Sequence, residues 1–374
     1  MSKNVLNEPF IRIEKRDGMS STKSIAIRII AVILALLVDA LFIFFITKLN
    51  PVEVYKTMFT GTFDFSFGIR MFETKLLRTL RDVALLLGIA IALAPAFKMR
   101  FWNIGAEGQV LVGALASAIC MQAFGSKISN PLLFAAMIVT SILAGALWGF
   151  IPAFFKAKWN TNETLFTLMM NYVAINIVTC MTNIWRGEKS SMGTINAGTR
   201  AGWFPMIMGQ RFTLNIIIVL ILTIAIFVYL KYSKHGYEIA VVGESENTAR
   251  YAGINVAKVI MRTMAISGAI CGICGFMTVA GKDQTISATS AGGYGFTAII
   301  VAWMSKFNTF FMMIIAFLIV FLEHGASEIA SNYSIMNDYA ADIISGIILF
   351  FLIGCEFFVN YKIKFRDFSD KGGK

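Results

Sequence analysis

Apolar runs of roughly 20 residues recur along almost the whole chain, and this pattern restricts the possible folds more than any other feature. A run of that length spans a bilayer as an α-helix, in which every backbone polar group is hydrogen-bonded within the segment. The composition agrees, because only 15% of the 374 residues are charged, whereas a soluble domain carries about 25%. The sequence therefore predicts an all-α, polytopic membrane protein.

The apolar periods predict about ten transmembrane helices. They lie near residues 26–49, 78–97, 105–124, 131–155, 164–184, 212–231, 259–281, 294–305, 308–323 and 342–361. Basic residues are enriched on the cytoplasmic side of membrane proteins, and a cytoplasmic N-terminus puts 21 of the 33 Lys and Arg residues on that side. We therefore expect a cytoplasmic N-terminal tail (1–25), a transmembrane domain (26–361) and a cytoplasmic C-terminal tail (362–374).

Three polar stretches have their own character. Residues 64–81 leave four basic residues on the assigned outer side, and we expect an amphipathic segment that lies at the membrane interface. Residues 185–211 are predicted to form the largest outer loop. Residues 232–258 are predicted to form the largest cytoplasmic loop.

The formal net charge of +11 does not indicate a nucleic-acid surface. The basic residues collect at helix ends, where long side chains reach the interface, and no basic run is interleaved with aromatic residues. A CxxC pair, Cys271 and Cys274, lies inside an apolar run far in sequence from both histidines. Small residues that allow close helix packing explain this pair better than zinc or redox chemistry. No metal and no cofactor is expected.

Residues 101–110, FWNIGAEGQV, interrupt the apolar pattern with polar residues and glycines. Gly105 and Gly108 each weaken a continuous helix by about 1 kcal/mol, and a carboxylate such as Glu107 is costly at the bilayer centre. Non-helical backbone at that depth is tolerated only beside protein or a water-filled cavity. We expect a broken helix whose new N-terminus presents free N–H donors to an aqueous pathway. The alternative is a tight cytoplasmic turn with a solvated Glu107.

A second interruption, SATSAGGYGF, occupies residues 287–296. Each interruption follows an apolar run and precedes a short apolar helix. Paired interruptions in two halves of a chain indicate the transport site of transporters that are built from repeats. The pattern predicts broken helices and an internal repeat.

Other polar and aromatic residues extend this candidate site. Asn162 and Glu163 open the fifth predicted span, and Asn171 lies within it. Interior amides either line a pathway or hold neighbouring helices together. Trp102 either stacks on a flat ligand or anchors the chain at the membrane interface.

The predicted cytoplasmic loop has a short polar helix in its sequence. Residues 246–252 favour a helix, and Gly253 is placed to end it. A short helix of mixed charge and small residues suits docking into a groove of a soluble partner. The alternative is an interfacial connector with no partner.

Four motifs resemble those of the permease subunits of ABC transporters. They are FWNIGAEGQ at 101–109, NETLFTLMMNYVA at 162–174, GYEIAVVGESENTARYAGINV at 236–256 and AGGYGFTAIIVA at 291–302. The resemblance is to the nucleoside-type branch, which is related to the ribose and branched-chain amino acid permeases, and it covers roughly residues 75–360. One departure is Trp102, where that family usually has Leu or a smaller aliphatic residue, and this bears on the shape of the pocket.

The resemblance implies a permease domain that forms half of a translocation pathway. Such a subunit pairs with a second related permease, is driven by a cytoplasmic ATP-binding subunit and receives nucleoside from an extracytoplasmic substrate-binding lipoprotein. By this analogy the residues that line or shape the pathway are Trp102, Asn103, Gly105, Glu107, Gly108, Gln109, Asn162, Glu163, Asn171, Tyr294 and Phe296. The coupling element that meets the ATPase comprises Gly236, Tyr237, Glu238, Gly243, Glu244, Arg250, Tyr251 and Gly253.

Other functions remain open at this point. The sequence has no GxxxxGK[ST] loop, so the chain does not hold ATP phosphates in that way and is not expected to be an enzyme. An ion-coupled secondary transporter would need intramembrane carboxylates or histidines as relays, and Asp39 in the first span is the main candidate. No Ser/His/Asp, Cys/His or metal constellation favours a membrane enzyme. Ribose or another simple sugar is the alternative cargo to a nucleoside.

Overall fold

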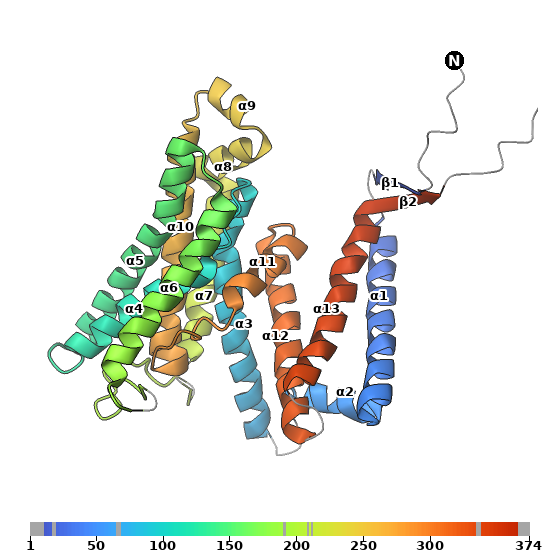
Figure 1. Ribbon diagram of the computed structural model, residues 1–374, viewed down its shortest axis with the longest axis horizontal. Coiled ribbons are helices and arrows are strands. Elements are labelled where there is room, and N and C mark those ends of the chain that lie inside the picture. The colour runs from blue at the N-terminus through green and yellow to red at the C-terminus, as the bar shows by residue number, and fades with distance from the viewer. Residues whose placement is uncertain are drawn as a thin grey trace, which may run out of the picture. The chain divides into compact units, whose positions relative to one another are not determined.

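The computed structural model describes residues 11–16, 20–64, 69–189, 192–207, 209–210, 212–333 and 338–365. Its elements in chain order are β1 (Ile11–Lys15), α1 (Ser21–Phe42), the π-helix η2 (Ile43–Thr47), α2 (Pro51–Thr60), α3 (Ile69–Lys98), α4 (Ala106–Phe124), α5 (Asn130–Trp159), α6 (Glu163–Arg186), α7 (Thr213–Tyr232), α8 (Lys234–Glu244), α9 (Glu246–Tyr251), α10 (Val256–Met277), the π-helix η3 (Thr278–Asp283), α11 (Tyr294–Met304), α12 (Thr309–Asn332), α13 (Asp338–Asn360) and β2 (Tyr361–Phe365) (Figure 1). The chain groups into two compact units, Glu73–Val320 and Met1–Phe72 with Phe321–Lys374.

The helices confirm an all-α polytopic membrane protein. Within the described ranges, nine helices are long and apolar enough to cross a membrane, and Tyr294–Met304 is a shorter apolar helix. This number agrees with the prediction of about ten spans, because the eighth predicted span, near residues 294–305, corresponds to this short helix.

The second span differs from the prediction in where it begins. Its helix, α3, begins at Ile69 rather than near residue 78, so most of the segment expected at the interface continues directly into the span; residues 65–68 lie outside the described residues. The helix runs through the basic stretch because residues 69–87 contain neither Gly nor Pro. Arg81 pairs with Asp82 at 2.7 Å within it, which offsets part of the positive charge.

Small residues bring α5 and α10 into close contact in the larger unit. A Cβ atom added to Gly268 of α10 would overlap the backbone of Gly145 in α5, and one added to Gly272 would overlap the backbone of Ser141. Helices in membranes gain from such close backbone approach because lipid offers no hydrophobic driving force between them. The expected packing role for the segment around Cys271 and Cys274 is therefore confirmed, and both cysteines are buried.

The smaller unit joins the two ends of the chain. Helices α1 and α13 run side by side (Figure 1), and Arg28 pairs with Glu356 across them at 2.6 Å. Beyond these helices β1 and β2 form an antiparallel pair in which Ile11 lies opposite Phe365. Both segments were predicted to be tails, and their pairing was not predicted from the sequence.

The long loop between α6 and α7 packs onto η3, the π-helix that follows α10. The backbone N–H of Ile195 donates to the carbonyl of Gln284 (2.9 Å), and that of Phe204 donates to the carbonyl of Ala280 (3.0 Å). The ring N–H of Trp203 donates to the Ile195 carbonyl (2.8 Å) and fixes the loop internally. The loop therefore lies at the end of the bundle opposite to the start of α10.

Candidate functional site

The first predicted interruption is a true break between two helices. Helix α3 ends at Lys98, α4 begins at Ala106, and the residues between them are not helical. The side-chain amide of Asn103 lies 3.4 Å from the hydroxyl of Ser267. Ser267 is eleven residues beyond the start of α10, or about 16 Å along that helix at 1.5 Å per residue. The break therefore lies well inside the helix bundle.

Amide side chains satisfy the backbone groups that the break exposes. The N–H of Gly105 donates to Oδ1 of Asn103 (3.0 Å), and the N–H of Gly108 donates to Oδ1 of Asn171 (2.8 Å). The Nδ2 of Asn171 donates to the carbonyl of Ile104 (2.8 Å), so one side chain bridges both sides of the break. For the N–H groups of Gly105 and Gly108 the expectation of free donors was therefore wrong. A buried donor without a partner costs about 1–3 kcal/mol, and these residues avoid that cost.

A small polar cluster is buried behind the break. Asn103 has no exposed surface, and its side chain lies 3.3 to 3.4 Å from that of Gln109. Gly105 and Gly108 are close to α6, because a Cβ atom on Gly108 would come within 2.9 Å of Asn171. Asn171 therefore contributes to helix packing, one of the two roles expected for it.

The two interruptions meet through Glu107. Its Oε1 accepts the N–H of Gly293 at 2.9 Å, and its Oε2 accepts the N–H of Gly295 at 2.7 Å. These donors belong to the first turn of α11. A negative charge is favoured there by the helix dipole and by the N–H groups that have no acceptor within the helix. Glu107 is only 6% exposed, so the alternative of a cytoplasmic turn with a solvated Glu107 was wrong.

Aromatic side chains lie at the surface next to the break. Trp102 is 45% exposed and stacks on Trp303 of α11, with ring centroids 5.1 Å apart and an interplanar angle of 15°. Together with Phe97 and Arg100 these rings line a cavity of about 160 Å³. Trp303 could not be predicted as a site residue, because no local sequence pattern places the end of α11 beside residue 102.

The remaining pathway candidates are more dispersed. Asn162 caps the N-terminus of α6 by accepting the N–H of Leu165 at 3.2 Å, and Glu163 pairs with Lys156 at 3.0 Å. Both side chains therefore have local roles at a helix end, and the structure does not bring them to Glu107. Tyr294 and Phe296 belong to the first turn of α11, next to Gly295.

Tyr294 faces a basic residue, and Phe296 is exposed. The ammonium group of Lys282 lies 5.2 Å from the centroid of the Tyr294 ring and 3.6 Å from a carboxylate oxygen of Asp82. The Phe296 ring is exposed on the same short helix. The break thus has an aromatic surface beside a buried polar interior.

The predicted cytoplasmic loop contains two helices rather than one. The predicted helix is present as α9, Glu246–Tyr251, and Gly253 follows it with φ +76°. Helix α8 was missed, because its small and β-branched residues give a weak helix signal. Figure 1 shows α8 and α9 together at one end of the larger unit, where they pack on α7 and α10.

Three of the coupling candidates fasten this loop to the bundle. A Cβ atom on Gly243 would overlap the carbonyl of Lys98, and one on Gly236 would overlap the backbone at Leu230. Glu238 accepts a hydrogen bond from Arg262 of α10 at 2.9 Å. This hydrogen bond lowers the pKa of Glu238 below its usual value of 4.5.

The other coupling candidates point away from the bundle. Tyr251 is 93% exposed, and Tyr237 and Glu244 are exposed as well. The guanidinium of Arg250 pairs with Glu246 of its own helix at 3.6 Å. The loop therefore has one anchored face and one open face.

Helices of membrane-spanning length, two helix breaks that meet inside the bundle, and an exposed helical loop at one end define a multi-pass membrane transport protein. Comparison with known proteins makes this assignment specific. The family model described as "Branched-chain amino acid transport system / permease component" matches residues 75–353, and the chain belongs to this family. It is a permease subunit of an ABC transporter. No solved structure matches the chain.

Similar proteins share most of their length with this chain. The guanosine ABC transporter permease protein NupP of Bacillus subtilis is 30% identical, over 90% of this chain and 94% of the relative. The glucose ABC transporter permease protein TsgB13 of Haloferax volcanii is 28% identical, over 84% of each chain. The nucleoside ABC transporter permease protein NupB of Lactococcus lactis is 25% identical, over 89% of this chain and 92% of the relative.

Proposed function

We propose that this permease subunit moves nucleosides into the cell as part of an ATP-driven importer. The observation that carries the proposal is the meeting of the two helix breaks through Glu107, with exposed aromatic rings beside them. Broken helices that meet inside a bundle are the usual setting of a transport site. The names of two relatives, which specify guanosine and nucleoside, favour a nucleoside as the cargo.

The chemistry of the break suits a neutral, flat cargo. An indole such as that of Trp102 stacks on a nucleobase, and amides replace the water that hydrates a base and its sugar. The buried residues Asn103, Glu107 and Gln109 shape the break, whereas Trp102 and Phe296 are open to the cargo. Phosphorylated cargo is disfavoured, because the described residues around the break include no dense cluster of Arg residues that would hold a phosphate.

ATP hydrolysis takes place on a separate cytoplasmic subunit in this proposal. That subunit docks on the open face of α8 and α9, and Tyr251 and Arg250 are its main contacts. The anchored face transmits the movement, since Gly243 touches the end of α3 directly before the first break. A second, related permease and an extracytoplasmic substrate-binding lipoprotein complete the importer.

Both termini lie in the cytoplasm in this proposal. The pairing of β1 with β2 supports a common side for the two ends, and the excess of Lys and Arg residues supports the cytoplasmic side. The exposed loop of α8 and α9 is then cytoplasmic too, as docking to an ATPase requires.

Uptake into vesicles tests the proposal. The chain would be reconstituted with its ATP-binding subunit and second permease, with the lipoprotein and labelled guanosine on the outer side. We expect uptake that requires ATP and that is inhibited by unlabelled nucleosides but not by glucose or ribose. Uptake driven by an ion gradient without ATP would contradict the proposal.

The coupling face is tested by exchanging Tyr251 for alanine. We expect Tyr251→Ala to abolish ATP-dependent uptake while the lipoprotein still binds guanosine, because the side chain contributes only to docking. Tyr232→Ala is a matched control, since Tyr232 is an exposed tyrosine at the end of α7 and belongs to neither α8 nor α9. Unchanged uptake by Tyr251→Ala would refute the coupling role.

A sugar is the second candidate cargo, and the 28% identity to a glucose permease favours it. Inhibition of guanosine uptake by glucose or ribose in the same vesicles would support this alternative. The ion-coupled alternative has less support. Asp39 is fully buried in α1, and within the part of the chain that the structure describes neither of its carboxylate oxygens has a hydrogen-bond partner that could pass on a proton.

A further inference from the structure

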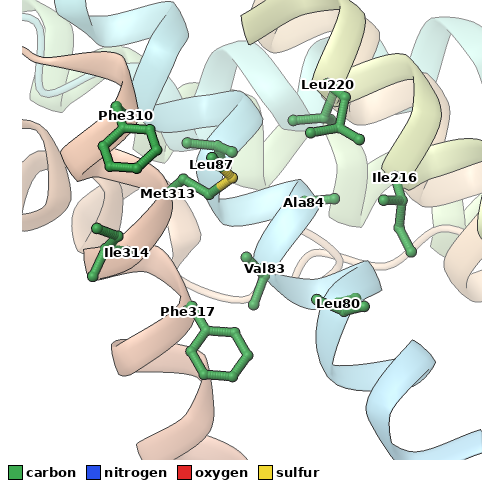
Figure 2. Close-up of a pocket in the computed structure, with 11 residues that line it drawn as sticks. Leu80, Val83, Ala84, Leu87, Ile216, Leu220, Phe310, Met313, Ile314 and Phe317 are labelled. Atoms are coloured by element: carbon green, nitrogen blue, oxygen red, sulfur yellow. The ribbon is translucent and has the colours of Figure 1, made fainter. Parts of the chain in front are cut away.

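An apolar groove runs between three helices of the larger unit. It has a volume of about 370 Å³. Its lining side chains are those on one face of α3 between residues 80 and 87, of α7 between 216 and 220, and of α12 between 310 and 317. Figure 2 shows these side chains converging on the space between the helices, with Phe310 at one end and Phe317 at the other. Every lining residue is apolar, so the groove suits hydrocarbon.

A basic cavity lies between the same three helices. Its volume is about 290 Å³, and it is lined by Lys98 of α3, Lys231 of α7, and Lys306 and Thr309 around the start of α12. Phe227, Leu230 and Phe307 add apolar surface to it. No acidic residue lines either cavity in the described part of the chain.

The basic cavity lies beyond one end of the apolar groove. On α3, Lys98 follows Leu87 by eleven residues, and on α7, Lys231 follows Leu220 by eleven residues. Each separation is about 16 Å along the helix. On α12, Thr309 directly precedes Phe310 of the groove. The ends of α3 and α7 and the turn before α12 therefore place positive charge at the same end of the apolar walls.

We propose that this surface binds an anionic phospholipid, with its phosphate among the three lysines and its acyl chain along the groove. A basic cavity between transmembrane helices attracts anionic headgroups, and the apolar wall below it covers the chain. Lysine stems also lie along apolar surface while their ammonium groups reach the interface. A free phosphate would leave the groove uncovered, and an apolar helix of a partner would not match the positive charge of the cavity.

Lipid retention tests the proposal. The full-length chain would be purified from membranes that contain phosphatidylglycerol and phosphatidylcholine in equal amounts, and the bound lipids would be counted by native mass spectrometry. We expect the wild type to retain phosphatidylglycerol selectively. Replacing Lys98, Lys231 and Lys306 together by Gln should weaken this retention by about 100-fold, because each lysine contributes to the attraction of an anionic headgroup.

Two matched controls separate the headgroup site from general charge and from folding. Lys258→Gln removes an exposed lysine outside the cavity, and it should leave the selectivity unchanged. Leu220→Trp fills the groove and should reduce retention, whereas Ile221→Trp changes the neighbouring residue, which does not line the groove, and should not. Because Leu220 and Ile221 are both exposed, neither variant places a ring in the core.

The expected pattern is loss of phosphatidylglycerol in the triple Lys→Gln variant and in Leu220→Trp, with both controls like the wild type. Equal retention of the two lipids by the wild type would overturn the proposal. Unchanged retention in the triple variant would overturn it too. Loss in the triple variant but not in Leu220→Trp would indicate a phosphate site without an acyl chain, and would overturn the assignment to a lipid.

Discussion

The carboxylate of Glu107 accepts the backbone N–H of Gly295 at 2.7 Å, although the two residues are 188 positions apart in the chain. The contact joins the break before α4 to the start of α11. A charged acceptor at a buried helix N-terminus is worth about 1.5–3 kcal/mol when the group is hydrogen-bonded. The two breaks are therefore mechanically linked, and a change at one reaches the other through this contact.

Gly295→Ala should break this link. A Cβ atom at Gly295 would overlap the backbone of Glu107, so α11 must move away from α4. Overpacking of this kind costs about 1–3 kcal/mol, and we expect a lower melting temperature in detergent together with little uptake. Gly346→Ala in α13 is the control, because nothing lies within 4 Å of that position. Equal melting temperatures for the two variants would contradict the prediction.

The sequence was informative where a local pattern has a local cause. The breaks, the extent of most spans and the helix that ends before Gly253 follow from glycines, carboxylates and apolar periods. Contacts between residues that are distant in the sequence do not follow from such local patterns. The sequence shows that the carboxylate of Glu107 is costly to bury in a membrane. The N–H groups that donate to this carboxylate belong to the backbone of residues 293 and 295, and backbone groups leave no side-chain signal in a sequence.

Asn171→Ala should disrupt the first break. The substitution leaves the N–H of Gly108 and the carbonyl of Ile104 buried without the partners they now have. Each unsatisfied group costs about 1–3 kcal/mol, so a lower melting temperature and reduced uptake are expected. Asn176→Ala is the matched control on the same helix, because Asn176 is exposed and its side chain donates to the carbonyl of Tyr172 in its own helix. Wild-type behaviour of both variants would count against the role of Asn171.

Two other parts of the fold show where sequence patterns are insufficient. The pairing of β1 with β2 joins segments that are more than 300 residues apart, and five-residue polar strands resemble ordinary tails in sequence. The neighbour of Trp102 is Trp303, and only the packing of α11 beside the end of α3 brings them together. Long-range neighbours of this kind need tertiary structure.

The ion pair of Glu238 with Arg262 should make the stability of the α8 anchor depend on pH. The pKa of Glu238 is lowered by the hydrogen bond from Arg262. A carboxyl group with a lowered pKa stabilises the folded chain above its usual value of 4.5, and the contribution is lost as the pH falls through the lowered pKa. The melting temperature of the wild type should therefore exceed that of Glu238→Gln at neutral pH.

The measurement is the difference in melting temperature between the wild type and Glu238→Gln as a function of pH. It should be constant from neutral pH down to about the usual pKa of glutamate, and it should shrink at lower pH. Glu244→Gln changes an exposed residue at the end of the same helix and should give no such difference. A wild-type advantage that persists in strong acid would show that the ion pair is not its cause.

Trp102→Leu tests whether the indole at the break recognises the base of the cargo. Trp102 is half exposed and stacked on Trp303, so a flat base can extend the stack at little cost in rearrangement. Stacking of a base on an aromatic ring is worth about 1–3 kcal/mol, and we expect KM for guanosine uptake to rise about tenfold in Trp102→Leu. Trp102→Phe should retain most of the affinity, because phenylalanine keeps an aromatic face.

Trp159→Leu is the matched control for this prediction. Trp159 is also exposed, but it packs on Phe154 and Phe155 at the end of α5. Its loss should leave KM unchanged, whereas an anchoring role at the membrane interface would make the Trp159 and Trp102 variants behave alike. A rise in KM confined to Trp102→Leu, with rescue by Trp102→Phe, therefore distinguishes recognition of the base from anchoring.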